Sequence, residues 1–194
     1  FTVDAASGAA HLGAAIAKAK KDPGSVSIGY PTVSPLLATE LLQKQSGAKF
    51  NLIPYRGIAQ GMPDMLGGRL DAWVGTSVTM RGFIGGGEVR GIAVTSAQRS
   101  PALPGVPTIA ESGFPGFELV SWYGIVAPAG TPAAIVAVLN AKLNETLRTP
   151  DVKAKLEADG ALILGGAPEQ LSRALRADMD RLGPRLKAAG IKPE

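Results

Sequence analysis

Side chains capable of acid–base or nucleophilic chemistry are few in this chain of 194 residues. Cysteine is absent, which excludes disulfides, thiolate metal sites and cysteine nucleophiles. The one histidine, His11, falls inside the first predicted helix, and no G-x-S-x-G motif accompanies it. Acidic pairs such as Asp64 and Asp71 are not spaced to converge on a metal ion. We therefore expect a protein that is not an enzyme and needs no cofactor, although a Ser–Lys or carboxylate-pair hydrolase stays open.

Anion binding is the chemistry that three short segments could perform, at residues 29–35, 55–59 and 75–79. In each, a strand-like run meets a helix-like run, and such loops gather at the carboxyl edge of an open α/β sheet. Orphan N–H groups and the helix dipole there would hold a carboxylate without any arginine. The residues that offer backbone N–H groups or small hydroxyls there are Thr32, Ser34, Gly57, Thr76, Ser77 and Thr79. The alternative, that these residues only cap their own helices, stays open.

Repeated strand–loop–helix units precede and follow these loops. The predicted strands cover residues 1–3, 26–28, 50–55, 70–74 and 91–95. Helical patterns lie between them, and the first is capped by Ser7 and runs to about Lys21. Alternation of this kind predicts an α/β fold with right-handed crossovers.

The later part of the chain has a different pattern. Residues 117–127 form the longest strand-like run, about twice the length of a typical strand, and could leave one sheet for another. Beyond Pro128 the sequence becomes helical, with one apolar face through Ile135, Leu139 and Leu143. We therefore predict a lobe over 1–120, a crossing over 121–127, and a helical segment of another lobe over 128–194.

Composition excludes two classes of partner. The net charge is +4, but Lys and Arg are scattered and form no basic stripe with stacking aromatics, so nucleic acid is not expected. No apolar run approaches the roughly 20 residues of a membrane span, so membrane insertion is not expected. No signal peptide opens the chain, and an exported protein would already have lost one, so these observations leave the compartment open.

Several motifs extend over nearly the whole chain and carry a family resemblance. They are Ile53-Pro-Tyr-Arg-Gly57, Asp64-Met-Leu-Gly-Gly-Arg-Leu-Asp71, the long block 91–117, Ser121-Trp-Tyr-Gly124 and Ala127-Pro-Ala-Gly-Thr-Pro132. In order and spacing they resemble the tripartite tricarboxylate transporter solute-receptor family, the Bug-type periplasmic substrate-binding proteins. The block at 91–117 is the most specific of them.

The resemblance implies a type II periplasmic-binding-protein-like α/β fold, a hinged clamp that closes on a small organic anion such as a carboxylate. Such a receptor delivers its ligand to the permease subunits of a membrane transporter and lies in the periplasm, its signal peptide removed. The chain resembles one complete sheet-and-helix lobe plus the C-terminal helices of the other lobe. The N-terminal part of the first lobe is then expected to be missing, and the apolar face of 128–194 to meet that segment or a second copy.

The resemblance also places the expected ligand-binding residues in the second lobe. Tyr30 and Tyr55 are expected to line the binding site, and Trp122 to lie near the hinge. The residues expected to contact the ligand come from the three loops. They are Thr32, Ser34, Gly57, Thr76 and Ser77. Leu36 stands where the family tends to have a histidine, and Gly75-Thr76 where it has an aspartate. The family's usual substrate is therefore not assumed. A ligand-sensing regulatory domain on the same fold, and a truncated receptor without ligand binding, remain alternatives.

Overall fold

The computed structural model describes residues 1–5, 11–158 and 160–188. The chain divides into two compact units, Phe1–Ser121 and Trp122–Glu194. The predicted cap Ser7 lies outside the described residues. In the described residues, no helix has both the length and the apolar character needed to cross a membrane.

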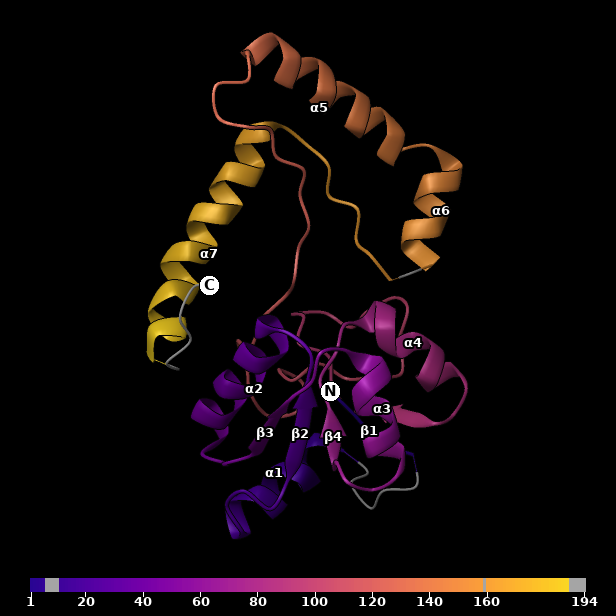
Figure 1. The fold of residues 1–194 in the computed structure, drawn as a ribbon, viewed down its shortest axis with the longest axis vertical. Coiled ribbons are helices and arrows are strands. Elements are labelled where there is room, and N and C mark those ends of the chain that lie inside the picture. The colour runs from indigo at the N-terminus through magenta and orange to yellow at the C-terminus, as the bar shows by residue number, and fades with distance from the viewer. Residues whose placement is uncertain (6–10, 159, 189–194) are drawn as a thin grey trace. The chain divides into compact units, whose positions relative to one another are not determined.

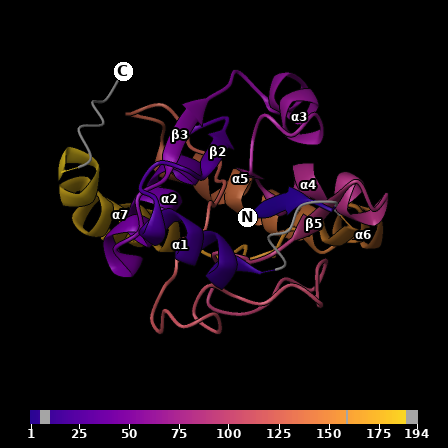
Figure 2. The same ribbon diagram turned by 90° about the horizontal axis from the view of Figure 1, so that it is seen from below.

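The first unit is built on a five-stranded sheet with the order β3-β2-β4-β1-β5 (Figure 1). Strand β2 pairs in parallel with both β3 and β4, whereas β1 pairs antiparallel with β4 and β5. The parallel β2–β3 pair is also visible from below in Figure 2. The five strands are β1 (Thr2–Asp4), β2 (Ser27–Tyr30), β3 (Asn51–Pro54), β4 (Ala72–Trp73) and β5 (Val89–Gly91).

Helices connect these strands, which confirms the predicted α/β class. They are α1 (Leu12–Lys21), α2 (Val33–Ser46), α3 (Ile58–Leu66) and α4 (Ser77–Gly85). The core includes Leu42 of α2, Met65 of α3 and Trp73 of β4, each fully buried. Apolar faces at helical spacing thus pack on the sheet, which stabilises helices too short to persist alone.

The single histidine has a structural role at the start of α1. His11 was predicted to lie inside the helix, but it is the N-cap residue, with extended backbone. Its Nδ1 accepts a hydrogen bond of 3.2 Å from the N–H of Ala14. The ring therefore satisfies one of the orphan donors of the first turn.

The long strand predicted over 117–127 is wrong, because the structure assigns no strand there. The N–H of Leu119 donates to the carbonyl of Thr95 at 2.9 Å, and the side chains of Phe117 and Leu119 are buried. Farther along, Tyr123 and Val126 are 90% and 79% exposed. A β-like sequence pattern becomes a strand only when another strand supplies hydrogen bonds, and residues 117–127 have no such ladder in the described chain.

In its described residues the second unit contains three helices, α5 (Ala133–Leu147), α6 (Pro150–Ala158) and α7 (Pro168–Ala188). Polar contacts tie them to the extended segments. The indole Nε1 of Trp122 donates to Asp178 of α7 at 2.7 Å. Asn144 of α5 accepts from the N–H of Gly166 at 2.6 Å and donates to its carbonyl at 3.0 Å.

Candidate functional site

Three parallel strands end together at one edge of the sheet. Tyr30 of β2 pairs with Pro54 of β3, and Gly29 pairs with Trp73 of β4. Beyond these pairs, the N–H of Tyr55 donates to the carbonyl of Tyr30 at 2.9 Å, so the neighbouring chains stay hydrogen-bonded where they leave the sheet. The three loops predicted to face a ligand therefore follow adjacent strands. We call the starts of α2, α3 and α4, with these loops, the carboxyl edge.

The N-cap side chain of helix α2 makes no hydrogen bond to the first turn of the helix. Thr32 is the N-cap residue with extended backbone, and its side chain makes no capping hydrogen bond. Thr32 and Ser34 are both exposed, whereas Pro35 is buried. Pro35 has no N–H, so Val33 and Ser34 supply the amides of this first turn, and the Thr32 hydroxyl occupies neither of them. The start of α2 can thus offer two amides and two hydroxyls to a ligand.

Helix α3 begins at a residue without a side chain. Gly57 is its N-cap and makes no side-chain hydrogen bond to the first turn. The preceding N–H, on Arg56, is satisfied by the side-chain oxygen of Gln60 at 3.1 Å. Arg56, which immediately precedes Gly57, is exposed, and the sequence-based site did not include it. An anion at this helix start would meet positive charge from the helix dipole.

Helix α4 differs, because its cap is occupied. The Oγ1 of Thr76 accepts from the N–H of Thr79 at 3.3 Å, and the Thr79 hydroxyl donates to the Thr76 carbonyl at 3.0 Å. Here the capping alternative describes what Thr76 does. The neighbouring Ser77 is half-buried and begins the helix.

The hydroxyl of Tyr55 is also engaged. It donates to Oδ2 of Asp64 at 2.9 Å, and Asp64 forms an ion pair of 3.2 Å with Arg69. Burial, followed by the hydrogen bond to Asp64, raises the pKa of Tyr55 above its ordinary value. The tyrosine is thus held in place as a neutral phenol. It does not supply a base.

Two residues important to this edge were missed by sequence reasoning, Asp64 and Trp73. Asp64 was rejected as a metal ligand and given no role at this edge, but it fixes Tyr55. Trp73 was placed in a strand without a role, but its ring lies 5.5 Å from that of Tyr55 and is fully buried. Gly29 and Gly75 could have indicated a bulky buried neighbour in the sequence, since glycine near strand ends permits the close approach of large side chains.

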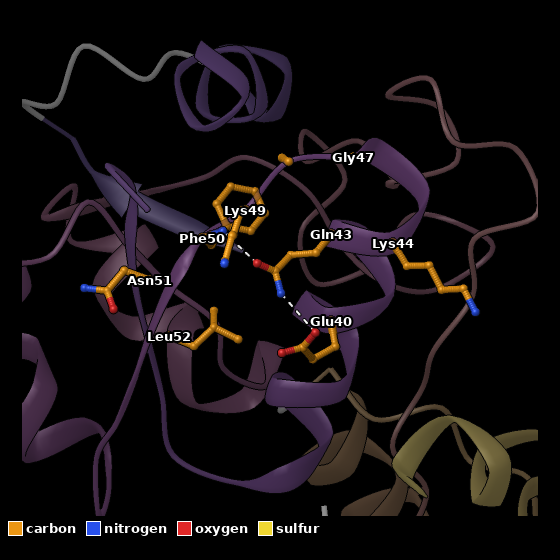
Figure 3. A pocket seen from close by; sticks show the side chains of 9 residues that line it. Glu40, Gln43, Lys44, Gly47, Lys49, Phe50, Asn51 and Leu52 are labelled. Atoms are coloured by element: carbon orange, nitrogen blue, oxygen red, sulfur yellow. Dashed lines mark hydrogen bonds between the residues drawn. The ribbon is translucent and has the colours of Figure 1, made fainter. Parts of the chain in front are cut away.

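A separate hollow of about 600 Å³ lies at the other end of these elements, where α2 ends and β3 begins (Figure 3). Gln43 crosses it, donating to Glu40 at 3.0 Å and accepting from the N–H of Phe50 at 2.7 Å. The side-chain amide of Gln43 is thus already bonded to groups that line the hollow. In the described part of the chain, no cluster of three or more His, Asp or Glu residues could hold a metal ion.

Comparison with known families gives one match over almost the whole chain. The family described as "Tripartite tricarboxylate transporter family receptor" matches residues 1–191. The chain is 38% identical over 166 residues to the UPF0065 protein in the tcbD-tcbE intergenic region of Pseudomonas sp. (strain P51), with 84% of this chain and 49% of the relative covered. It is 33% identical to Protein BugT of Bordetella pertussis, with 93% and 56% covered. The chain therefore spans about half the length of these two relatives.

Solved structures show the same likeness in three dimensions. R. palustris Rpa4515, solved with adipate, has a TM-score of 0.88 and 32% identity, with 100% of this chain and 65% of that chain covered. The periplasmic binding protein BugD has a TM-score of 0.84 and 28% identity, with 100% and 66% covered. These likenesses confirm the predicted periplasmic-binding-protein type of α/β fold.

Proposed function

The chain belongs to the tripartite tricarboxylate transporter receptor family, as its motifs predicted, and from this premise we propose that it serves as a solute receptor for a small organic anion. The ligand class is a small carboxylate, and the second-lobe half of the site is the carboxyl edge. The contacts come from Thr32, Ser34, Gly57, Thr76 and Ser77, with Tyr30 and Tyr55 as the wall.

The main support for this proposal is that two helices at the carboxyl edge begin without a side-chain cap. At α2 and α3 no side chain caps the first turn, so their amides are left to water or to a ligand. A carboxylate accepts several such N–H bonds at once and is favoured by the dipoles of helices that start side by side. The adipate bound to R. palustris Rpa4515, which is 32% identical to this chain, supports the same ligand class.

The rest of the proposal follows from the family. The receptor works in the periplasm, changes no bond in its ligand and hands it to the permease subunits of a transporter. We propose that the wall facing the carboxyl edge comes from a first lobe, and that closure of the two lobes replaces ligand hydration by oriented amides.

Isothermal titration of the full chain, stripped of bound ligand, with a panel of dicarboxylates from malonate to adipate tests the proposal. We expect stoichiometric binding of at least one member, and recovery of that compound unchanged. Heat from no member of the panel would overturn the proposal. Conversion of the compound into a product would instead establish an enzyme.

Two matched variants separate binding from capping at this edge. Thr32→Ala removes a hydroxyl that caps nothing, so we expect weaker binding with an unchanged melting temperature. Thr76→Ala removes a working N-cap that is also a proposed contact, so we expect about 1 kcal/mol of lost stability in addition to weaker binding. Equal effects of the two variants on stability would contradict the assigned difference between α2 and α4.

A further inference from the structure

A single indole lies directly beneath the carboxyl edge. Trp73, the last residue of β4, is 0% exposed and belongs to the core that contains Met62, Met65 and Met80. It pairs with Gly29 in the sheet, where the N–H of the next residue, Val74, donates to the Gly29 carbonyl at 3.0 Å. The ring thus lies where β2 and β4 both end.

Glycines from three separate elements make room for this ring. A methyl group at Gly29 of β2 would lie 2.6 Å from Cε3 of Trp73, and one at Gly61 of α3 would overlap Cζ3. A methyl group at Gly75, after β4, would lie 2.9 Å from Nε1. None of the three can be exchanged for a larger residue without moving the ring or the backbone, because interiors are close-packed.

Each of these glycines stands close to one of the three helix starts. Gly75 directly precedes Thr76, the N-cap of α4. Gly61 lies in the first part of α3, where its N–H donates to the carbonyl of the N-cap Gly57 at 3.3 Å. Gly29 lies in the strand that leads into α2. One rigid side chain therefore touches the backbone that carries all three sets of amides.

The indole nitrogen argues against a purely stabilising role. Nε1 of Trp73 is buried and has no hydrogen-bond partner among the described residues. An unpaired buried N–H opposes folding, and a phenylalanine would fill much of the same space without it. The feature that only tryptophan supplies here is the full length and width of its ring against three glycine backbones.

We propose that Trp73 is a positioning residue of the binding site, and that its indole sets the spacing of the starts of α2, α3 and α4. This proposal rests on the proposed function of the carboxyl edge. Since hydrogen bonds weaken steeply with misalignment, a shift of these amides changes both the affinity for a carboxylate and the preference among carboxylates of different length. Trp73 itself touches no ligand.

The test is Trp73→Phe in the full chain, measured by titration with the dicarboxylate that binds the unaltered chain best. We expect affinity to fall about tenfold, the effect of one weakened hydrogen bond to a charged acceptor. The ranking of shorter and longer dicarboxylates changes as well, which a loss of thermal stability alone would not cause. Phe50→Leu, at a buried aromatic residue just before the start of β3 and away from the carboxyl edge, is the matched control and leaves the ranking unchanged.

A pair of substitutions makes the test specific to the glycine contact. Gly61→Ala alone is expected to weaken binding, because its methyl group would overlap the indole, and to do so less when Trp73 is Phe. An unchanged affinity and ranking in Trp73→Phe, or full additivity with Gly61→Ala, would overturn the positioning role. If Trp73→Phe does not fold, Gly75→Ala, which presses on the same ring, takes its place with the same expected outcome. Failure of the unaltered chain to bind any dicarboxylate would instead reject the proposed function.

Discussion

The two units of this chain bury their apolar residues very differently. In the described residues, the buried hydrophobic side chains run from Phe1 to Leu119 and so all fall in the first unit. Helices α5 and α6 of the second unit contain no buried residue. The apolar faces of the helices therefore pack against a sheet in the first unit. The helices of the second unit have no sheet to pack against in the described residues. A helical sequence pattern predicts which face will be buried, but another element has to bury it.

The second unit is organised instead by a few polar contacts. Trp122 is hydrogen-bonded to Asp178, and Asn144 holds both backbone groups of Gly166. Such bonds contribute modestly, about 1 kcal/mol each, when water can replace them. The first unit thus depends on burial and the second on specific hydrogen bonds, and the following experiments test that contrast.

The largest expected effect is a core truncation in the first unit. Leu42→Ala removes a fully buried side chain from α2 and should lower the free energy of unfolding by about 2–5 kcal/mol. The matched change in the second unit, Leu139→Ala, affects a side chain that is 50% exposed and should cost less than about 1 kcal/mol. Denaturant unfolding of both variants gives the comparison. A large loss at Leu139 would mean that its face is covered in solution.

Association in solution is the next effect in size. The stripe through Ile135 and Leu139 is half exposed, at 50% for each residue, and so offers apolar side chains that another apolar surface could cover. We expect the isolated 194-residue chain to self-associate in light scattering, and Ile135→Lys to reduce the association. Ala141→Lys, at an exposed position on the other side of α5, is the control. A strictly monomeric, stable chain would contradict this expectation.

The difference between the units also explains how much of the fold the sequence could predict. The β2, β3, α3 and α4 regions were predicted because periodicity, glycine and proline act locally. The insertion of β1 between β4 and β5 was not predicted, because strand order depends on contacts remote in sequence. The prediction of a strand at 117–127 was wrong for the same reason. The sequence pattern of these residues does not show whether a neighbouring strand is available to pair with them.

The candidate site shows the same limit at the level of single side chains. The three loops could be predicted, because parallel strands bring their carboxyl ends to one edge. Thr32 and Thr76 look alike in sequence, each preceding a helix, and only geometry shows that one caps its helix and the other does not. Trp73 was missed because its environment comes from glycines on three elements.

A smaller, pH-dependent effect tests the polar anchor of the second unit. The hydrogen bond from Trp122, together with Arg181, holds the pKa of Asp178 below its ordinary value of 3.8. Its stabilising effect is therefore complete above 3.8 and is lost as the pH falls through the lower folded-state pKa. In a Trp73→Phe background, where Trp122 is the only tryptophan, we expect a fluorescence transition below pH 3.8 that Asp178→Asn removes. A transition that survives in Asp178→Asn would assign it to another group.

The smallest effect is expected at a polar anchor of the first unit. The Glu111 carboxylate accepts from the N–H of Thr108 at 2.7 Å and from Arg99 at 2.9 Å, and the first of these bonds is the main cause of its lowered pKa. Its contribution is present above the ordinary value of 4.5 and is lost as the pH falls through the lower folded-state pKa. Glu111→Gln should thus lower the melting temperature slightly at neutral pH and not at all in acid. Because the neighbouring Ile109 is fully buried, this loop keeps its place when the anchor is lost. A loss of stability in Glu111→Gln as large as that in Leu42→Ala would mean that the first unit, too, depends on its polar contacts as much as on its core.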